Sequence, residues 1–329
     1  MLNHLQYLFI YIIILFSVIL LSKKLGFFDE PNSRKIHKKK ILNTSGIALY
    51  LFLILIASNF EYSFKLEEII IYGFFIVLCG FIDDQYKLSP SVKLLIIYLP
   101  TAFLIFKDYN LTDLGSYEYL GYINLGKFGL IFTLLACGLL INSYNYIDGI
   151  DGLLIGLYII SLVYLIFIIA NTNISKLLEF FIIGLSVNLF FNFLPYKNNF
   201  KIYMGDAGSL FLGFFMCFLL IYLYKFEKIH PSYLIWVCWY PVYDFLYVTT
   251  SRILNKKSFY QADNIHFHHY ILKKFNHSHI KASFIIYLIY TIGLLLGFFI
   301  TDHIGLIYSL ITFIIAFLLF YLVRNKFEK

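Results

Sequence analysis

Residues 208–224 read GSLFLGFFMCFLLIYLY, a run of 17 residues without a charged side chain. A membrane-spanning helix needs about 20 mostly apolar residues to cross the hydrocarbon core of a bilayer. Ten other runs of this kind lie near residues 5–22, 46–60, 66–82, 92–106, 128–144, 152–170, 177–194, 230–250, 283–300 and 304–323. No linker or internal repeat divides them. The sequence therefore predicts an all-α polytopic membrane protein with about eleven transmembrane helices in a single domain, residues 1–329.

The composition excludes most soluble classes of protein. Hydrophobic residues make up 60% of the chain and charged residues 14%, whereas a soluble domain is about 45–50% apolar and about 25% charged. The net charge of +7 does not indicate nucleic-acid binding, because Lys and Arg are confined to particular loops. The four cysteines lie in apolar runs without the spacing of metal ligands, so we expect buried thiols and neither disulfides nor zinc ligands.

Lys and Arg are unevenly divided between the two sets of loops that alternate along the chain. Of the 26 Lys and Arg residues, 20 fall in one set and 6 in the other. The richer set comprises loops 23–45, 83–93, 145–151, 195–207 and 251–282 and the C-terminal tail. Loops rich in Lys and Arg stay in the cytoplasm. We therefore expect a multi-pass protein of the cell inner (plasma) membrane, with its N-terminus outside and its C-terminus in the cytoplasm.

Polar residues that could carry chemistry gather in four of the basic-side loops. In the first loop, the adjacent carboxylates Asp83 and Asp84 end one apolar run and Lys93 opens the next. Ionisable residues in or beside a membrane span are energetically unfavourable and are usually functional. Their clustering on one side predicts a cytoplasmic-face active-site cleft, although a solvated helix end would also explain a lone pair of aspartates.

The second cluster repeats an oxygen ligand at every third position, with Asn142, Asn145, Asp148 and Asp151. That spacing places the four side chains along one helical face if the helix continues through them. Capping of a loop explains one Asn and one Asp, but not four such residues in a stretch without Lys or Arg.

The third cluster lies at the start of the run of residues 208–224 and centres on Asp206, which stands between Gly205 and Gly208. Backbone N–H groups at a helix start can bind an anion such as phosphate. Asp206 would place a hard oxygen ligand beside that anion, as Mg²⁺ sites do. An ordinary N-cap by Asp206 or Ser209 is the simpler alternative.

The fourth cluster combines Arg252 with three histidines, His266, His268 and His269. Zinc needs a further ligand and a histidine spacing that faces one centre, so we favour contact with a phosphate or nucleotide. The basic residues 34–40 allow the same contact or bind anionic lipid headgroups, and for residues 38–40 we favour the lipid.

These clusters, in this order, resemble the polyprenyl-phosphate N-acetylhexosamine-1-phosphate transferases, glycosyltransferase family 4. The resemblance runs from Asp29-Glu30-Pro31 to about Leu272. It implies a phosphoglycosyltransferase that transfers a sugar-1-phosphate, with GlcNAc-1-phosphate as the default, from a UDP-sugar to undecaprenyl (polyprenyl) phosphate. UMP would be released, a lipid-linked cell-surface glycan would be started, and Mg²⁺, or alternatively Mn²⁺, would be required. Partners would be the two substrates and the lipid bilayer, without nucleic acid; a homodimer is compatible with this.

The resemblance also implies roles for individual residues. Asn145 and Asp206 match the magnesium-binding positions, and Asp83 and Asp84 match the pair that engages the polyprenyl phosphate, so we expect Asp83, Asp84 and Asp206 to be catalytic. The expected substrate-binding residues are Lys93, Asn142, Asp148, Asp151, Arg252, His266, His268 and His269. Asp244 matches a further family position whose role does not follow from the sequence.

Two alternatives remain open. A transporter for a nucleotide sugar or anion predicts repeats and polar residues near mid-membrane, whereas these clusters lie at the ends of spans. Within the family, the MraY branch, which acts on UDP-MurNAc-pentapeptide, has three consecutive histidines, and the interrupted His266-Phe267-His268-His269 resembles the WecA branch. Departures from the family pattern at Leu42 and Asn264 lie in loops that hold substrate, so they bear on the choice of sugar.

Overall fold

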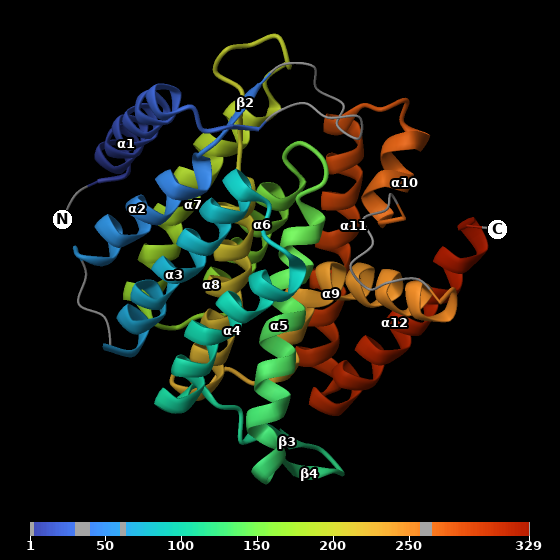
Figure 1. Cartoon of the computed structure of the whole chain (residues 1–329). Helices are drawn as coiled ribbons and strands as arrows, with labels where there is room; N and C mark the ends of the chain where they lie inside the picture. The colour runs from blue at the N-terminus through green and yellow to red at the C-terminus, as the bar shows by residue number, and fades with distance from the viewer. Residues whose placement is uncertain (1–2, 30–39, 60–63, 257–264, 329) are drawn as a thin grey trace.

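The computed structural model of the chain describes residues 3–29, 40–59, 64–256 and 265–328 (Figure 1). Each of the eleven apolar runs coincides with a helix over most of its described length. The α-helices are α1 (His4–Leu25), α2 (Ser45–Ala57), α3 (Phe64–Tyr86), α4 (Pro90–Leu104), α5 (Gly129–Ile147), α6 (Leu153–Ile168), α7 (Thr172–Phe193), α8 (Gly205–Lys225), α9 (Pro231–Leu254), α10 (Phe267–Lys274), α11 (His279–Phe299) and α12 (Leu306–Glu328). Short π- or 3₁₀-helical turns are η1 (Ile105–Tyr109), η2 (Gly126–Phe128) and η3 (Ile300–Ile304).

The predicted all-α polytopic membrane protein is confirmed. Within the described ranges, seven helices are long and apolar enough to cross a membrane, and α2 and α6 are shorter apolar helices. The number of eleven spans stays a prediction. The interpretations placed on residues 34–39 and on Asn264 fall outside the described residues.

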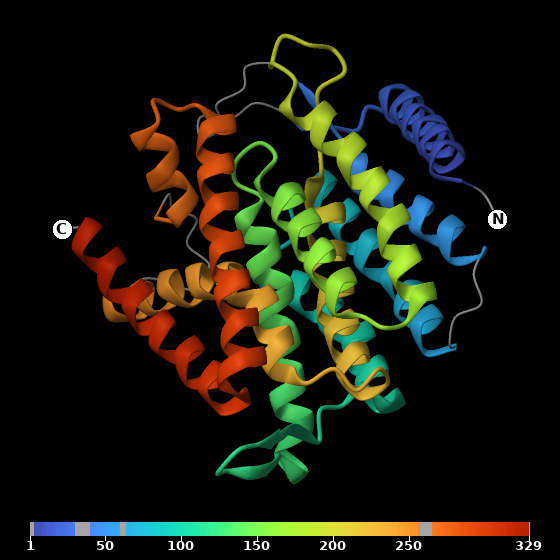
Figure 2. The ribbon, with the colours of Figure 1, turned by 180° about the vertical axis from the view of Figure 1, so that it is seen from behind.

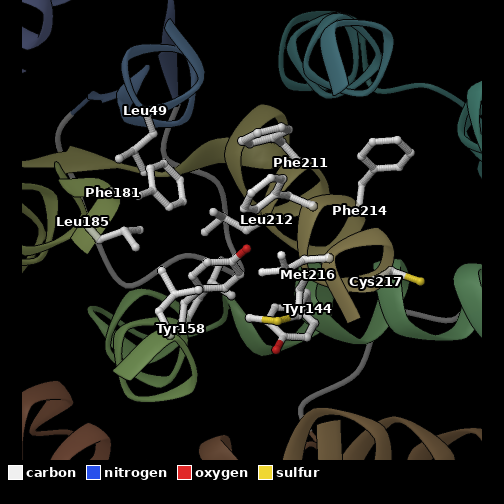
Figure 3. Close-up of a cluster of buried hydrophobic side chains, with 14 of the residues drawn as sticks. Leu49, Tyr144, Tyr158, Phe181, Leu185, Phe211, Leu212, Phe214, Met216 and Cys217 are labelled. Atoms are coloured by element: carbon white, nitrogen blue, oxygen red, sulfur yellow. The ribbon is translucent and has the colours of Figure 1, made fainter. Parts of the chain in front are cut away.

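The uncharged run of residues 208–224 lies in α8, the central helix of the protein. Every residue of α8 from Ala207 to Leu223 is buried. Figure 3 shows its side chains Phe211, Leu212 and Met216 surrounded by side chains from α2, α5, α6 and α7. Helices on the periphery are different, because only 11% of the residues in the apolar stretch of α12 are buried, and this helix presents a large apolar face. A central apolar helix surrounded by helices with exposed apolar faces is the arrangement expected in lipid.

Small residues let the neighbouring helices approach the start of α8. A Cβ atom on Gly46 of α2 would lie 2.2 Å from the Gly208 Cα, and one on Gly80 of α3 would lie 2.4 Å from the Ala207 Cα. Close backbone approach at small residues is how helices associate in a membrane, where burial of apolar surface gives little driving force. These contacts fix the ends of α2 and α3 against the first turn of α8.

Two small sheets mark opposite ends of the helix bundle (Figures 1 and 2). At one end, β2 (Ile41–Asn43) pairs antiparallel with β1 (Phe28–Asp29) and parallel with β5 (Ile202–Tyr203). At the other end, β3 (Asp113–Tyr117) and β4 (Gly121–Asn124) form a hairpin. Because β2 leads into α2 and β5 leads into α8, the first sheet brings the starts of both helices together. The predicted site residues lie at this end.

Candidate active site

Four residues from four helices meet around one ammonium group. Lys93 Nζ, in the first turn of α4, donates hydrogen bonds to Asp83 Oδ2 at 2.8 Å and to Asp206 Oδ2 at 2.9 Å. Asn145, near the end of α5, donates from Nδ2 to Asp206 Oδ1 at 3.0 Å and to Ser209 Oγ at 2.7 Å. The structure therefore brings three of the four predicted clusters to one centre.

The connection between α3 and α4 is folded so that Lys93 returns to Asp83. Asp83 Oδ1 accepts a hydrogen bond from the backbone N–H of Leu88 at 2.7 Å, which closes the loop after α3. The next helix begins with Ser89 as its N-cap and Pro90 in its first turn, a residue pair that favours helix initiation. Asp83 is 7% exposed, and both of its oxygens are engaged.

Asp84 points away from this centre and caps the central helix. Its Oδ1 accepts from the Asp206 N–H at 3.1 Å and from Asn43 Nδ2 at 3.2 Å, and its Oδ2 accepts from the Ala207 N–H at 3.3 Å. Gly205 precedes these donors with φ +71°, and a Cβ there would lie 2.6 Å from Asp84 Oδ2. The helix start that was expected to hold a substrate anion holds the Asp84 carboxylate, which the helix dipole also favours.

The donor set around Lys93 fits a magnesium ion. Asp83 Oδ2, Asp206 Oδ2 and Asn145 Oδ1 lie 2.8, 2.9 and 3.5 Å from Lys93 Nζ, so three hard oxygens already surround one cationic group. Mg²⁺ is bound through one or two carboxylates, with phosphate oxygens and water at the remaining positions. Asp206 and Asn145 are the two residues that would hold it.

The sequence predicted that Asn142, Asn145, Asp148 and Asp151 share one helical face if the helix continues through them. The helix α5 ends at Ile147, so Asp148 and Asp151 lie outside it. Asn142 Nδ2 bonds back to the Gly138 carbonyl oxygen of its own helix at 2.7 Å. Asp148 follows the last helical residue and is half-buried. Burial, together with the negative charges of Asp206, Asp84 and Asp151, raises the pKa of Asp148 to about 8.

Asp151 forms a buried ion pair away from the Lys93 centre. Its Oδ2 lies 2.9 Å from Lys201 Nζ, and Lys201, 3% exposed, also donates to the Leu194 carbonyl oxygen at 3.0 Å. The Asp151 N–H donates to His279 Nδ1 at 3.0 Å. These contacts join the α5–α6 loop to the residues before β5 and to the start of α11, so they hold the loop that carries Asp148.

The histidine cluster packs against the same α5–α6 loop. His268 is fully buried, and a Cβ on Gly149 would lie 2.2 Å from its Nε2. Burial and the neighbouring histidines hold the pKa of His268 well below its usual range, and the same causes lower the pKa of His269 to about 4. The Arg252 guanidinium lies 6.0 Å from the ring of Tyr146 at the end of α5. The fourth cluster thus lies against the end of α5 and the loop after it, the segment that also carries Asn145 and Asp148.

His266 is held by a residue whose role the sequence left open. Its Nδ1 lies 2.8 Å from Asp244 Oδ2, and its ring stacks between those of Tyr146 and His268, with ring centroids 5.4 Å away on each side. Over the part of the chain that the structure describes, one group of three His, Cys, Asp or Glu side chains is close enough to share a metal ion. It consists of Asp244, His266 and His268.

Three contributing residues could not be identified from the sequence. Asn43 lies in a three-residue strand, Lys201 precedes the motif that contains Asp206, and Arg324 belongs to the last helix. Arg324 is 1% exposed, donates to the Ile265 carbonyl oxygen and lies 5.3 Å from the Phe267 ring. The only signal was charge, because Lys201 and Arg324 are basic residues in or beside segments that are otherwise apolar.

Comparison with known proteins identifies relatives along most of the chain. Residues 67–224 match the model of "Glycosyl transferase family 4". The chain is 32% identical over 277 residues to a "Probable undecaprenyl-phosphate N-acetylglucosaminyl 1-phosphate transferase" of Bacillus subtilis (strain 168), covering 81% of this chain and 75% of the relative. It is 27% identical over 259 residues to the "Undecaprenyl-phosphate alpha-N-acetylglucosaminyl 1-phosphate transferase" of Escherichia coli (strain K12), covering 77% and 71%. The protein of the same description from Yersinia pestis is 28% identical over 259 residues, covering 76% and 70%.

Proposed function

The chain belongs to glycosyltransferase family 4, and from that membership we propose that it transfers GlcNAc-1-phosphate from UDP-GlcNAc to undecaprenyl phosphate and releases UMP. The observation that carries the proposal is the convergence of Asp83, Lys93 and Asp206 at the ends of three helices. Phosphoryl transfer depends mostly on positioning and on neutralising charge, and this centre supplies an ammonium group, carboxylates and a neighbouring amide. The product would start a lipid-linked glycan.

The reaction consists of one bond formed and one broken at phosphorus. An oxygen of the lipid phosphate attacks the phosphorus that carries the sugar, and the bond to the UMP oxygen breaks. The second pKa of a phosphate monoester is about 6, so the acceptor is mostly dianionic at neutral pH and does not need a strong base. We assign Lys93 to hold the phosphate oxygens and Asp83 to orient Lys93.

The contacts of Asp83 favour direct attack by the lipid phosphate over a covalent aspartyl intermediate. Its Oδ1 is bound by the Leu88 N–H and its Oδ2 by Lys93. A carboxylate with both oxygens engaged in hydrogen bonds is a weak nucleophile, because those bonds stabilise its charge. We therefore assign Asp83 an orienting role.

A magnesium ion at Asp206 and Asn145 would neutralise the diphosphate and stabilise the UMP leaving group. The contacts of Asp84 support a metal ion at this position. Asp84 already accepts hydrogen bonds from the N–H groups of Asp206 and Ala207 at the start of α8. The helix start therefore cannot supply the positive charge for a diphosphate beside it. Lys93 supplies positive charge at this helix start, a bound Mg²⁺ would supply more, and Mn²⁺ has the same ligand preferences.

We place the site on the cytoplasmic face of the cell inner membrane, with the β3–β4 hairpin on the outside. The division of 20 Lys and Arg residues against 6 supports this orientation. The site residues lie at the ends of helices and near the sheet of β1, β2 and β5. A transporter would need polar residues near the middle of the membrane, so the same placement makes transport of a nucleotide sugar the weaker candidate.

A substrate panel tests the proposal. The purified full chain in lipid nanodiscs is incubated with undecaprenyl phosphate, Mg²⁺ and one UDP-sugar at a time, and UMP release is measured. We expect turnover with UDP-GlcNAc, no turnover without the lipid acceptor, and little with UDP-MurNAc-pentapeptide. Comparable turnover of the pentapeptide substrate would assign the chain to the MraY type. Absence of UMP release with every UDP-sugar in the panel would reject the proposed transferase activity.

A further inference from the structure

We infer that Asp244 is a positioning residue that fixes the tautomer and the orientation of His266, an inference that rests on the proposed function in taking His266 as a substrate-facing group. Asp244 lies in α9 and is fully buried. His266 immediately precedes α10. The pair therefore connects the histidine segment to a long helix. The connection is made through His266 Nδ1, and the protonation of this atom decides what the other ring nitrogen can do.

Asp244 binds the histidine segment through both carboxylate oxygens. Oδ2 lies 2.8 Å from His266 Nδ1, and Oδ1 accepts from the backbone N–H of Phe267 at 2.8 Å. The second bond fixes the carboxylate plane, and the first then fixes the ring. The interplanar angles of 20° with Tyr146 and 15° with His268 show that the ring also stacks on two nearly parallel neighbours.

The bond determines where the histidine carries its proton. An ionised carboxylate can only accept hydrogen bonds, so His266 Nδ1 must carry hydrogen. The remaining nitrogen, Nε2, then carries the lone pair, so it is the ring atom through which His266 would exchange a proton with a substrate group. A carboxylate behind the ring stabilises the imidazolium that results, which is the function of the aspartate in Asp–His pairs of other enzymes.

A metal ion shared by Asp244, His266 and His268 is the alternative use of these groups. The Arg324 guanidinium argues against it, because it bonds to the Ile265 carbonyl oxygen, next to His266, and lies 5.3 Å from the Phe267 ring. Its positive charge also helps to lower the pKa of His268. A divalent cation would be repelled by this guanidinium, whereas a substrate anion would not.

A double-mutant cycle tests whether Asp244 acts through His266. Asp244→Asn keeps the size of the side chain and an acceptor for Phe267, but its amide group would donate to His266 Nδ1 and reverse the tautomer. We expect kcat to fall on the order of 10- to 100-fold, with a smaller change in KM for UDP-GlcNAc. In a His266→Gln background, Asp244→Asn should cause no further loss. A purely structural Asp244 would give losses that multiply in the double variant, and that outcome overturns the inference.

The matched control is Asp302→Asn, since Asp302 accepts a hydrogen bond from Tyr233 at the opposite end of α9. It should leave kcat and KM unchanged.

A second measurement does not depend on activity. Solid-state ¹⁵N NMR of the wild-type full chain, with His266 assigned by its absence in His266→Gln, should show a protonated Nδ1, and Asp244→Asn should move the proton to Nε2. An unprotonated Nδ1 in the wild-type protein would overturn the inference. If the transferase assay fails with every donor while this signal is present, the proposed function is wrong and the Asp244–His266 pair stands.

Discussion

The ammonium group of Lys93 lies 2.9 Å from a carboxylate oxygen of Asp206, although the two residues are separated by 113 positions in the chain. Each residue lies in the first turn of its helix, α4 for Lys93 and α8 for Asp206. The ion pair therefore joins two helix starts at the centre of the site. Lys93 also binds Asp83, so one cation is shared by two carboxylates. A diphosphate bound here would meet an ammonium group and two carboxylates that lie within hydrogen-bond distance of that ammonium group.

Removing the Lys93 ammonium should abolish most of the activity. Lys93→Gln leaves Asp83 and Asp206 facing each other without a cation and removes a donor for the substrate phosphates. We expect kcat to fall by about 100-fold or more, which is the range for loss of one charged or hydrogen-bonding group from a transition state. Steady-state UMP release measures it. Lys87→Gln, an exposed lysine in the same loop, is the matched control, and an equal loss in both variants would show that the Lys93 ion pairs are not responsible.

Asp83 and Asp84 should differ in their effects on stability. Asp84→Asn removes the charge that caps α8 and sets an amide N–H₂ group against a backbone N–H, so the melting temperature should fall by about 2 °C or more. Turnover should fall as well, because Asp206 belongs to the capped turn. Asp83→Asn should lower turnover with a smaller fall in melting temperature, because the remaining oxygen can still accept from the Leu88 N–H and Lys93 keeps its pair with Asp206. Thermal unfolding in detergent measures both. Equal melting temperatures for the two variants would contradict the assigned cap.

Asp148 should make the stability of the protein depend on pH. The pKa of Asp148 is raised to about 8 from an ordinary value of 3.8. Between these values the unfolded chain is ionised and the folded chain holds the proton, so folding takes up a proton and stability falls as pH rises. Asp148→Asn cannot ionise. The melting temperature of the variant minus that of the wild-type protein should therefore increase from pH 5 to pH 9, measured without added Mg²⁺. A difference that does not change with pH would mean that Asp148 is ionised in the folded protein throughout.

The buried Lys201–Asp151 pair should contribute to stability more than to catalysis. Lys201→Met leaves Asp151 as a buried charge without its cation, and breaking such a pair typically lowers the free energy of unfolding by about 3–5 kcal/mol. Restoring neutrality with Asp151→Asn in the same chain should recover part of the loss. Thermal unfolding of the two single variants and the double variant provides the comparison. A loss in the double variant equal to the sum of the two single-variant losses would show that the pair is not coupled.

Much of the fold could be predicted from the sequence because long apolar runs specify membrane helices almost alone. The short strand that holds Asn43 and the helix that begins at Phe267 could not be predicted, because two- or three-residue strands and a polar eight-residue helix have no such pattern. Their positions depend on contacts with Asp84 and with Asp244.

The sequence predicted which loops carry the residues of the candidate site, but not how those residues lie relative to one another. The every-third-residue spacing predicted that Asn145 and Asp151 share a face, but the end of α5 at Ile147 separates them. The pairing of Asp84 with the α8 backbone, and of Asp244 with His266, joins distant parts of the chain. Such pairings depend on how helices pack, which local sequence patterns do not contain.

The central claim is that Asp206 holds the magnesium ion at which GlcNAc-1-phosphate is transferred. The most direct test is UMP release from UDP-GlcNAc by Asp206→Asn and wild-type protein, measured with undecaprenyl phosphate over a range of Mg²⁺ concentrations. Asp206→Asn keeps the size of the side chain, and its melting temperature should show that it folds. We expect wild-type turnover to require Mg²⁺, and we expect the turnover of Asp206→Asn to be lower by about 100-fold or more at every Mg²⁺ concentration. Near-normal turnover of Asp206→Asn at limiting Mg²⁺ would contradict the central claim, because the metal ion would then be bound by other residues.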